Sequence, residues 1–97
     1  MTDIPLNDAT AAIAKRIVWF EPPENSLRDT TRFLAYAFTY ALPEDMKIIR
    51  TYIDDDRLRA ALDNAPPGII DPRSWAYWQS KLGRYPAPPL PTRRLDP

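Results

Sequence analysis

The sequence contains no cysteine and no histidine among its 97 residues. These two residue types supply the commonest zinc ligands, the strongest protein nucleophile and the commonest general base near neutral pH. Their absence also excludes disulfide bonds and reactive thiolates, which is consistent with a reducing compartment. The composition therefore argues against an enzyme that uses any of these groups.

Glycine is almost as scarce, with only Gly68 and Gly83 in the chain. A phosphate-binding loop needs several glycines close together, so none is present. The only carboxylate cluster is Asp54, Asp55 and Asp56. Adjacent positions at the start of a helix point in different directions, so capping and helix-dipole interactions explain this run better than metal binding does. We expect no catalytic residue, no metal and no cofactor.

A charge of one sign is also lacking, because 13 basic residues balance 13 acidic ones. A dedicated nucleic-acid-binding protein usually has a basic excess, so the balance argues against that class. No apolar run approaches the roughly 20 residues that span a bilayer. The first ten residues, "MTDIPLNDAT", show no basic and apolar signal-peptide regions. We expect a cytoplasmic protein without a membrane partner.

Proline, by contrast, is abundant, and its twelve residues divide the chain into short segments. The first segment predicts a helix with Asn7 or Asp8 as its N-cap. The strand-forming residues "RIVWF" leave open whether residues 13–20 are helical or extended. The clearest helix is predicted over residues 27–42, with Ser26 and Asp29 forming a capping box. Apolar residues cover about half its circumference, which predicts either a central helix or a helix with a second partner surface.

The later helices have clear start and stop signals. Pro43 is predicted to start one helix, Asp54 to cap the next, and Asp71 with Pro72 to start the last, which Gly83 ends. No segment alternates with period two for long enough to build a sheet. The predicted fold is an all-α bundle of four to five short helices over residues 1–84. Residues 85–97 are predicted to form an extended proline-rich tail.

The stretch "RSWAYW" places its rings on two sides of the last helix. At 100° per residue, Trp75, Trp78 and Leu82 share one side, so we predict that they are core residues. Tyr77 lies on the opposite side, beside Arg73 and Lys81. An exposed tyrosine together with arginine is typical of a protein contact surface. The predicted partner-binding residues follow this outer side into the tail: Arg73, Tyr77, Lys81, Arg84, Tyr85, Arg93 and Arg94.

The tail itself allows several interpretations. "PPLPTR" at residues 88–93 fits the P-x-x-P-x-R pattern of ligands for proline-recognising domains, although such patterns often arise by chance where prolines are dense. A tail that wraps a partner or lies on its own helices is favoured. We expect removal of residues 86–97 to leave the helices intact and to weaken partner binding. If it does not weaken binding, the surface should be sought at Phe33, Tyr36 and Tyr40.

An alternative function is a small DNA-binding regulator. Residues 43–65 have the spacing of a helix-turn-helix. The second helix would open with three aspartates facing the DNA phosphates, offset only by Arg57 and Arg59. We therefore favour two consecutive core helices over this alternative.

The order of several short motifs resembles a group of small bacterial proteins. The motifs are "WF" at 19–20, "RFL" at 32–34, "PED" at 43–45, "RTY" at 50–52, "AL" at 61–62, then "RSWAYW" and "LG" within 73–83. Members of this group are typically encoded beside AbiEii-type nucleotidyltransferase toxins and are taken to be their antitoxins, or are left as domains of unknown function. The resemblance implies a nucleotidyltransferase-type toxin as the partner and no catalytic residue in this chain.

Overall fold

A computed structural model describes residues 4–90 of the chain. Within these residues the fold is all-α, without a β-strand, which confirms the predicted class. None of the helices in this range is long and apolar enough to cross a membrane. The helices are α1 (Asp8–Ile17), α2 (Pro23–Ser26), α3 (Thr30–Tyr40), α4 (Pro43–Ile49), α5 (Asp55–Asp63) and α6 (Pro72–Lys81).

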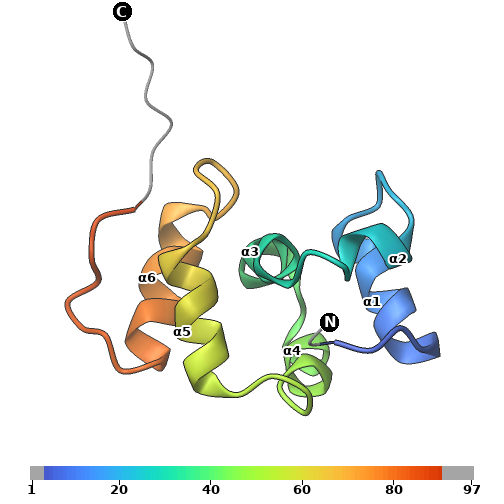
Figure 1. Ribbon diagram of the computed structural model, residues 1–97. Helices are drawn as coiled ribbons and strands as arrows, with labels where there is room; N and C mark the ends of the chain where they lie inside the picture. The colour runs from blue at the N-terminus through green and yellow to red at the C-terminus, as the bar shows by residue number, and fades with distance from the viewer. Residues whose placement is uncertain (1–3, 91–97) are drawn as a thin grey trace, which may run out of the picture.

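Helix α3 lies at the centre of the molecule (Figure 1). It packs against α1 and α2 on one side and against α5 and α6 on the other. Its buried residues cover somewhat more than half of the helix circumference: Thr30, Phe33, Leu34, Ala35, Ala37 and Phe38. The wide apolar arc read from the sequence therefore reflects a central position, which is the first of the two predicted alternatives.

The start of this central helix differs from the prediction. Ser26 is the last residue of the extra one-turn helix α2, and its Oγ donates to Glu21 Oε1 at 3.1 Å. Asp29 is the N-cap of α3 and accepts from Arg32 N at 3.2 Å. The Pro22–Pro23 pair explains the change, because proline is preorganised for the first position of a helix and starts α2 before the expected cap. This extra turn gives six helices in the described part of the chain instead of four to five.

The other helix boundaries follow the sequence signals closely. Asn7 Oδ1 accepts from Thr10 N at 2.9 Å, and Asp54 Oδ1 accepts from Arg57 N at 2.8 Å. Asp71 Oδ1 caps α6 by accepting from Ser74 N at 2.7 Å. After α6 the backbone of Gly83 takes a φ of 86°, a left-handed conformation that favours glycine.

The sequence left open whether residues 13–20 are helical or extended, and the structure shows where α1 ends. The helix stops at Ile17, and the next residues form a turn before Pro22. Ile13 and Ile17 are buried in the core, whereas Trp19 and Phe20 lie outside it. The strand-forming residues at 18–20 are therefore neither helix nor strand.

Both tryptophans of α6 are buried, which confirms their predicted place in the core. Trp78 Nε1 donates to the carbonyl oxygen of Phe38 at 3.2 Å, and Trp75 Nε1 donates to that of Pro88 at 2.7 Å. Each indole is therefore buried with its polar atom satisfied. Gln79 beside them is fully buried, yet its side-chain nitrogen and oxygen have no hydrogen-bond partner in the described structure.

The first part of the predicted tail lies against the helices. After α6 the chain turns back and runs alongside it (Figure 1), and the Trp75–Pro88 hydrogen bond joins the two segments. Ala87 and Leu90 pack against the core. Removal of residues 86–97 would therefore uncover Trp75, so the expectation that this deletion spares the fold is at odds with these contacts. Residues 91–97, with the end of the "PPLPTR" motif, lie outside the described residues.

Candidate partner-binding surfaces

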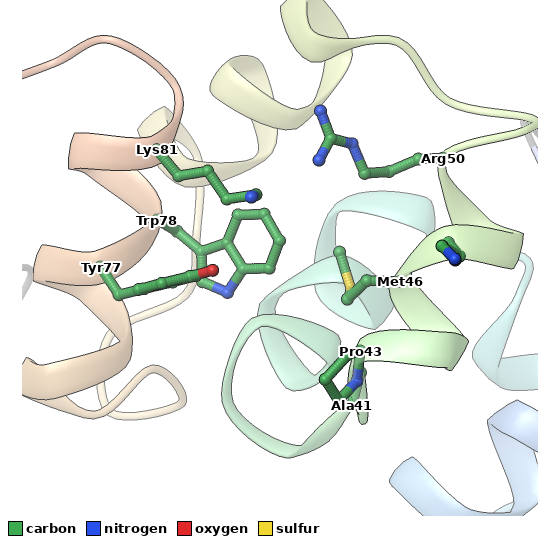
Figure 2. A pocket seen from close by; sticks show the side chains of 8 residues that line it. Ala41, Pro43, Met46, Arg50, Tyr77, Trp78 and Lys81 are labelled. Atoms are coloured by element: carbon green, nitrogen blue, oxygen red, sulfur yellow. The ribbon is translucent and has the colours of Figure 1, made fainter.

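A groove of about 450 Å³ lies between α4 and α6. Met46 of α4 and Trp78 of α6 are largely buried residues that also line this groove. In Figure 2 the side chains of Lys81 and Arg50 extend toward each other from opposite sides, and the Trp78 indole lies below the Lys81 side chain. We call this the α4–α6 groove, and its lining residues are Ala41, Pro43, Met46, Lys47, Arg50, Tyr77, Trp78 and Lys81.

The groove carries charge of one sign only. Lys47, Arg50 and Lys81 line it, and none of its lining residues is acidic. Arg50 Nη2 also contacts Asp55 Oδ1 at 2.8 Å, which partly offsets one of the three charges. The Lys81 ammonium lies 5.9 Å from the centre of the Tyr77 ring, a cation–π distance. The groove is therefore suited to an acidic group flanked by apolar atoms.

Its aromatic wall is held rigidly by the core. The Tyr77 and Trp78 rings meet edge to face at 5.3 Å, and Trp78 contacts Phe38 of α3 at the same centroid distance. The Trp78 hydrogen bond to the Phe38 carbonyl fixes the indole further. A partner side chain would meet preorganised rings here, which lowers the entropy lost on binding.

The structure separates the predicted partner-binding residues. Tyr77 and Lys81 line the α4–α6 groove, whereas Arg73 is exposed without lining it. Arg84 is held by both carboxylate oxygens of Asp63 at the end of α5. Tyr85 is 85% exposed on the segment that turns back along α6. Arg93 and Arg94 lie outside the described residues.

Sequence reasoning missed the α4 half of the groove. Lys47 and Arg50 of α4 were not among the predicted partner-binding residues. A signal existed, because Lys47 and Arg50 are three residues apart and share a helix face. The sequence did not show that this face lies opposite Tyr77 and Lys81.

A second surface of different character lies where α1 ends beside α3. Four aromatic rings follow one another there: Trp19 to Phe20 at 5.8 Å, Phe20 to Tyr36 at 5.8 Å, and Tyr36 to Tyr40 at 6.5 Å. Trp19 is 79% exposed, Tyr40 60% and Phe20 50%. Together with Arg16 and Ile17, these rings line a hollow of about 360 Å³. We call Trp19, Phe20, Tyr36 and Tyr40 the ring surface.

The cations beside the ring surface are paired with acids of the same chain. Arg16 holds Asp45 with two hydrogen bonds, Nη1 to Oδ2 at 2.9 Å and Nη2 to Oδ1 at 2.5 Å. Arg32 Nη1 donates to Glu21 Oε1 at 2.5 Å, and its guanidinium lies 5.4 Å from the Tyr36 ring centre. These hydrogen bonds from arginine lower the pKa of Asp45 and that of Glu21. Both pairs therefore stay ionised and leave the surface close to neutral.

The fallback site of the sequence interpretation is partly wrong. Tyr36 and Tyr40 belong to the ring surface, but Phe33 is buried in the core and cannot contact a partner. Trp19, the most exposed residue of this surface, and Phe20 were not among the predicted partner-binding residues. Their position shortly before Pro22 and Pro23 is a usable signal, since a helix usually ends before a proline and the residues there need not face the core.

The arginines of the alternative DNA-binding helix are engaged within the protein. Arg57 Nη2 donates to Thr31 Oγ1 at 3.1 Å. Arg59 donates to Asp56 Oδ1 at 2.5 Å and to the Leu82 carbonyl oxygen at 3.0 Å. The buried side of α5, formed by Leu58, Ala61 and Leu62, packs against α3. Helix α5 therefore has few free cations to offer to phosphates.

No group of three or more acidic residues in the described range is arranged to hold a metal ion. Compared with known protein families, curated proteins and solved structures, the chain shows no match to any of them. The resemblance to the antitoxin group therefore stays a prediction, and the functional argument rests on the two surfaces.

Proposed function

We propose that the protein is an antitoxin-like interaction module, without catalytic activity of its own, that binds and restrains a nucleotidyltransferase-type toxin in the cytoplasm. The observation that carries this proposal is the α4–α6 groove, which joins three cations to two fixed rings and has no acid in its lining. The motif resemblance supplies the class of partner.

The chemistry of such a partner fits the groove. Enzymes that transfer phosphoryl or nucleotidyl groups gather carboxylates to hold divalent metal ions. A cationic groove can pair with such carboxylates, and Lys47 and Lys81 are the cations that no acid in the lining offsets. Tyr77 adds contact area at a low entropic cost. Binding at the carboxylates would compete with the metal ions and so inhibit the enzyme.

The test is a calorimetric titration with the nucleotidyltransferase-type protein that the resemblance implies in a neighbouring gene. Lys81→Glu reverses one groove charge and should weaken binding tenfold or more, about 1.4 kcal/mol. Arg28→Glu is the matched control, because Arg28 is exposed and does not line the groove. It should leave the affinity within twofold, and added salt should weaken the wild-type complex.

Two results would overturn the proposal. One is equal affinity of Lys81→Glu and Arg28→Glu for the toxin. The other is a sequence-specific shift of the chain's own promoter DNA at physiological salt, which would favour the regulator that uses residues 43–65.

A further inference from the structure

The ring surface exposes the aromatic side chains of Trp19, Phe20 and Tyr40 on one part of the molecule. An aromatic side chain carries roughly 150–250 Å² of surface. The exposed fractions of Trp19, Phe20 and Tyr40 then correspond to roughly 300–450 Å² of exposed ring surface. This area is comparable to the largest apolar patch of a typical monomer, which is often a functional surface.

The ring surface has both a projecting side chain and a hollow. Trp19 stands at one end of the ring series as its most exposed member, and the hollow lies between the rings and α1. A projection and a hollow on the same patch are what a twofold interface requires, because each copy then offers its projection to the hollow of the other.

The electrostatics also permit a second copy. In a twofold interface each surface meets itself, so unpaired charges of one sign would repel. Here Arg16 is paired with Asp45 and Arg32 with Glu21, which removes that repulsion. The α4–α6 groove would repel a copy of itself, because Lys47 and Lys81, which no acid in its lining offsets, would face their own copies.

We infer that the ring surface is the interface of a homodimer, in which Trp19 of each copy enters the hollow of the other. This inference does not depend on the toxin partner. The exposed ring area is roughly half of the ~800 Å² that each partner buries in a standard interface. The dimer should therefore be weak, with a dissociation constant in the micromolar range.

Sedimentation velocity of the full chain from about 1 μM to about 1 mM covers this range. The wild type should change from monomer to dimer as its concentration rises. Trp19→Ala should raise the dissociation constant at least tenfold, and its circular dichroism should stay unchanged, because Trp19 makes few contacts with the core. Tyr77→Ala, which removes a 55% exposed ring from the α4–α6 groove, is the matched control and should dimerise normally.

A second variant tests the charge argument without removing a ring. Glu21→Gln leaves Arg32 without its acid, so like charges would meet across the twofold axis. The dimer should weaken at low salt and recover as salt screens the repulsion. Tryptophan fluorescence gives an independent readout, since Trp75 and Trp78 are buried and the emission of Trp19 should shift to longer wavelength on dilution.

Three results would overturn the inference. The first is a monomer at every concentration. The second is a dimer that Trp19→Ala leaves unchanged, which would place the interface elsewhere. The third is a monomer whose toxin binding Trp19→Ala weakens, which would assign the ring surface to the toxin.

Discussion

The α4–α6 groove and the ring surface both expose aromatic rings, yet they differ in how charge is arranged around those rings. In the groove, Lys47 and Lys81 have no acidic neighbour in the lining. At the ring surface each arginine is held by a carboxylate of its own chain. A surface with unpaired positive charges selects an acidic partner that differs from the chain itself. A surface whose charges are paired can accept a copy of itself.

The two surfaces also differ in how they are attached to the core. Trp78 is buried beneath the groove by Phe38, while Trp19 projects from a turn. They meet at the end of α3, where Tyr40 belongs to the ring surface and Ala41 to the groove. Their proximity makes it necessary to test each surface with variants that leave the other intact.

The largest expected effect separates the two kinds of ring. Trp78→Ala should lower the free energy of unfolding by about 3–5 kcal/mol, because it removes a buried indole and its hydrogen bond to Phe38. Trp19→Ala should change it by less than about 0.5 kcal/mol. Urea unfolding followed by circular dichroism measures both, and similar losses would mean that Trp19 is part of the core.

The second largest expected effect concerns the tail, whose two parts are expected to contribute to the fold and to toxin binding. Deletion of residues 86–97 should lower the free energy of unfolding by about 2–4 kcal/mol, since Trp75 Nε1 loses Pro88 and the core loses Leu90. Deletion of residues 91–97 keeps these contacts and removes Arg93 and Arg94. This shorter deletion should leave the fold intact and weaken toxin binding tenfold or more.

Thermal melts check the stability of both deletions and calorimetry checks the affinity. If the chain that lacks residues 91–97 binds the toxin as tightly as the full chain, Arg93 and Arg94 do not contribute to binding, and the groove alone carries the interaction.

A smaller effect concerns the charge balance at the ring surface. The hydrogen bonds from Arg16 lower the pKa of Asp45, so this pair stabilises the folded state above the unfolded pKa of about 3.9. That contribution is lost as the pH falls through the lower pKa of the folded state. Asp45→Asn should cost about 1–3 kcal/mol at pH 7 and less in acid.

Asp63→Asn is the control for this experiment. It removes the more exposed Arg84 pair and should cost less than about 1 kcal/mol. Because the chain has no histidine, the stability of the wild type should change little between pH 5 and pH 8. Unfolding of both variants over a range of pH measures these losses in the free energy of unfolding. Equal losses in the two variants would contradict the structural role of Asp45.

The smallest effect is a gain in stability on the helix that carries the groove. Gln79 is buried with neither side-chain polar atom hydrogen-bonded. Gln79→Met keeps the shape and removes the unsatisfied polar atoms, so it should raise the free energy of unfolding by about 1–2 kcal/mol. Denaturant titration measures the gain, and a loss would show that Gln79 has a partner in solution.

The sequence predicted most of the fold because helix signals are local. Asn7, Asp54 and Asp71 cap the helices they were expected to cap, and the helical wheel placed Trp75 and Trp78 correctly in the core. The predicted start of α3 was wrong because two helix-start signals, the proline pair and the aspartate cap, lie within seven residues of each other. Pro23 started a turn of its own, and Asp29 then served as the cap instead of Ser26.

The sites were less predictable, because each joins residues distant in sequence. Tyr77 and Lys81 were chosen correctly as an outward-facing pair, but their neighbours Lys47 and Arg50 come from α4, some thirty residues earlier. The ring surface joins Trp19 to Tyr40 across two helices. A helical wheel shows which side of a helix is polar, but not which other helix lies opposite.

One paired measurement tests most directly whether the two surfaces have separate partners. Self-association and affinity for the nucleotidyltransferase-type toxin would be measured for Trp19→Ala and for Lys81→Glu. Trp19→Ala should lose self-association and keep toxin binding, and Lys81→Glu should do the reverse, with changes of tenfold or more. A variant that weakens both interactions equally, or neither, would contradict the separation of the two surfaces.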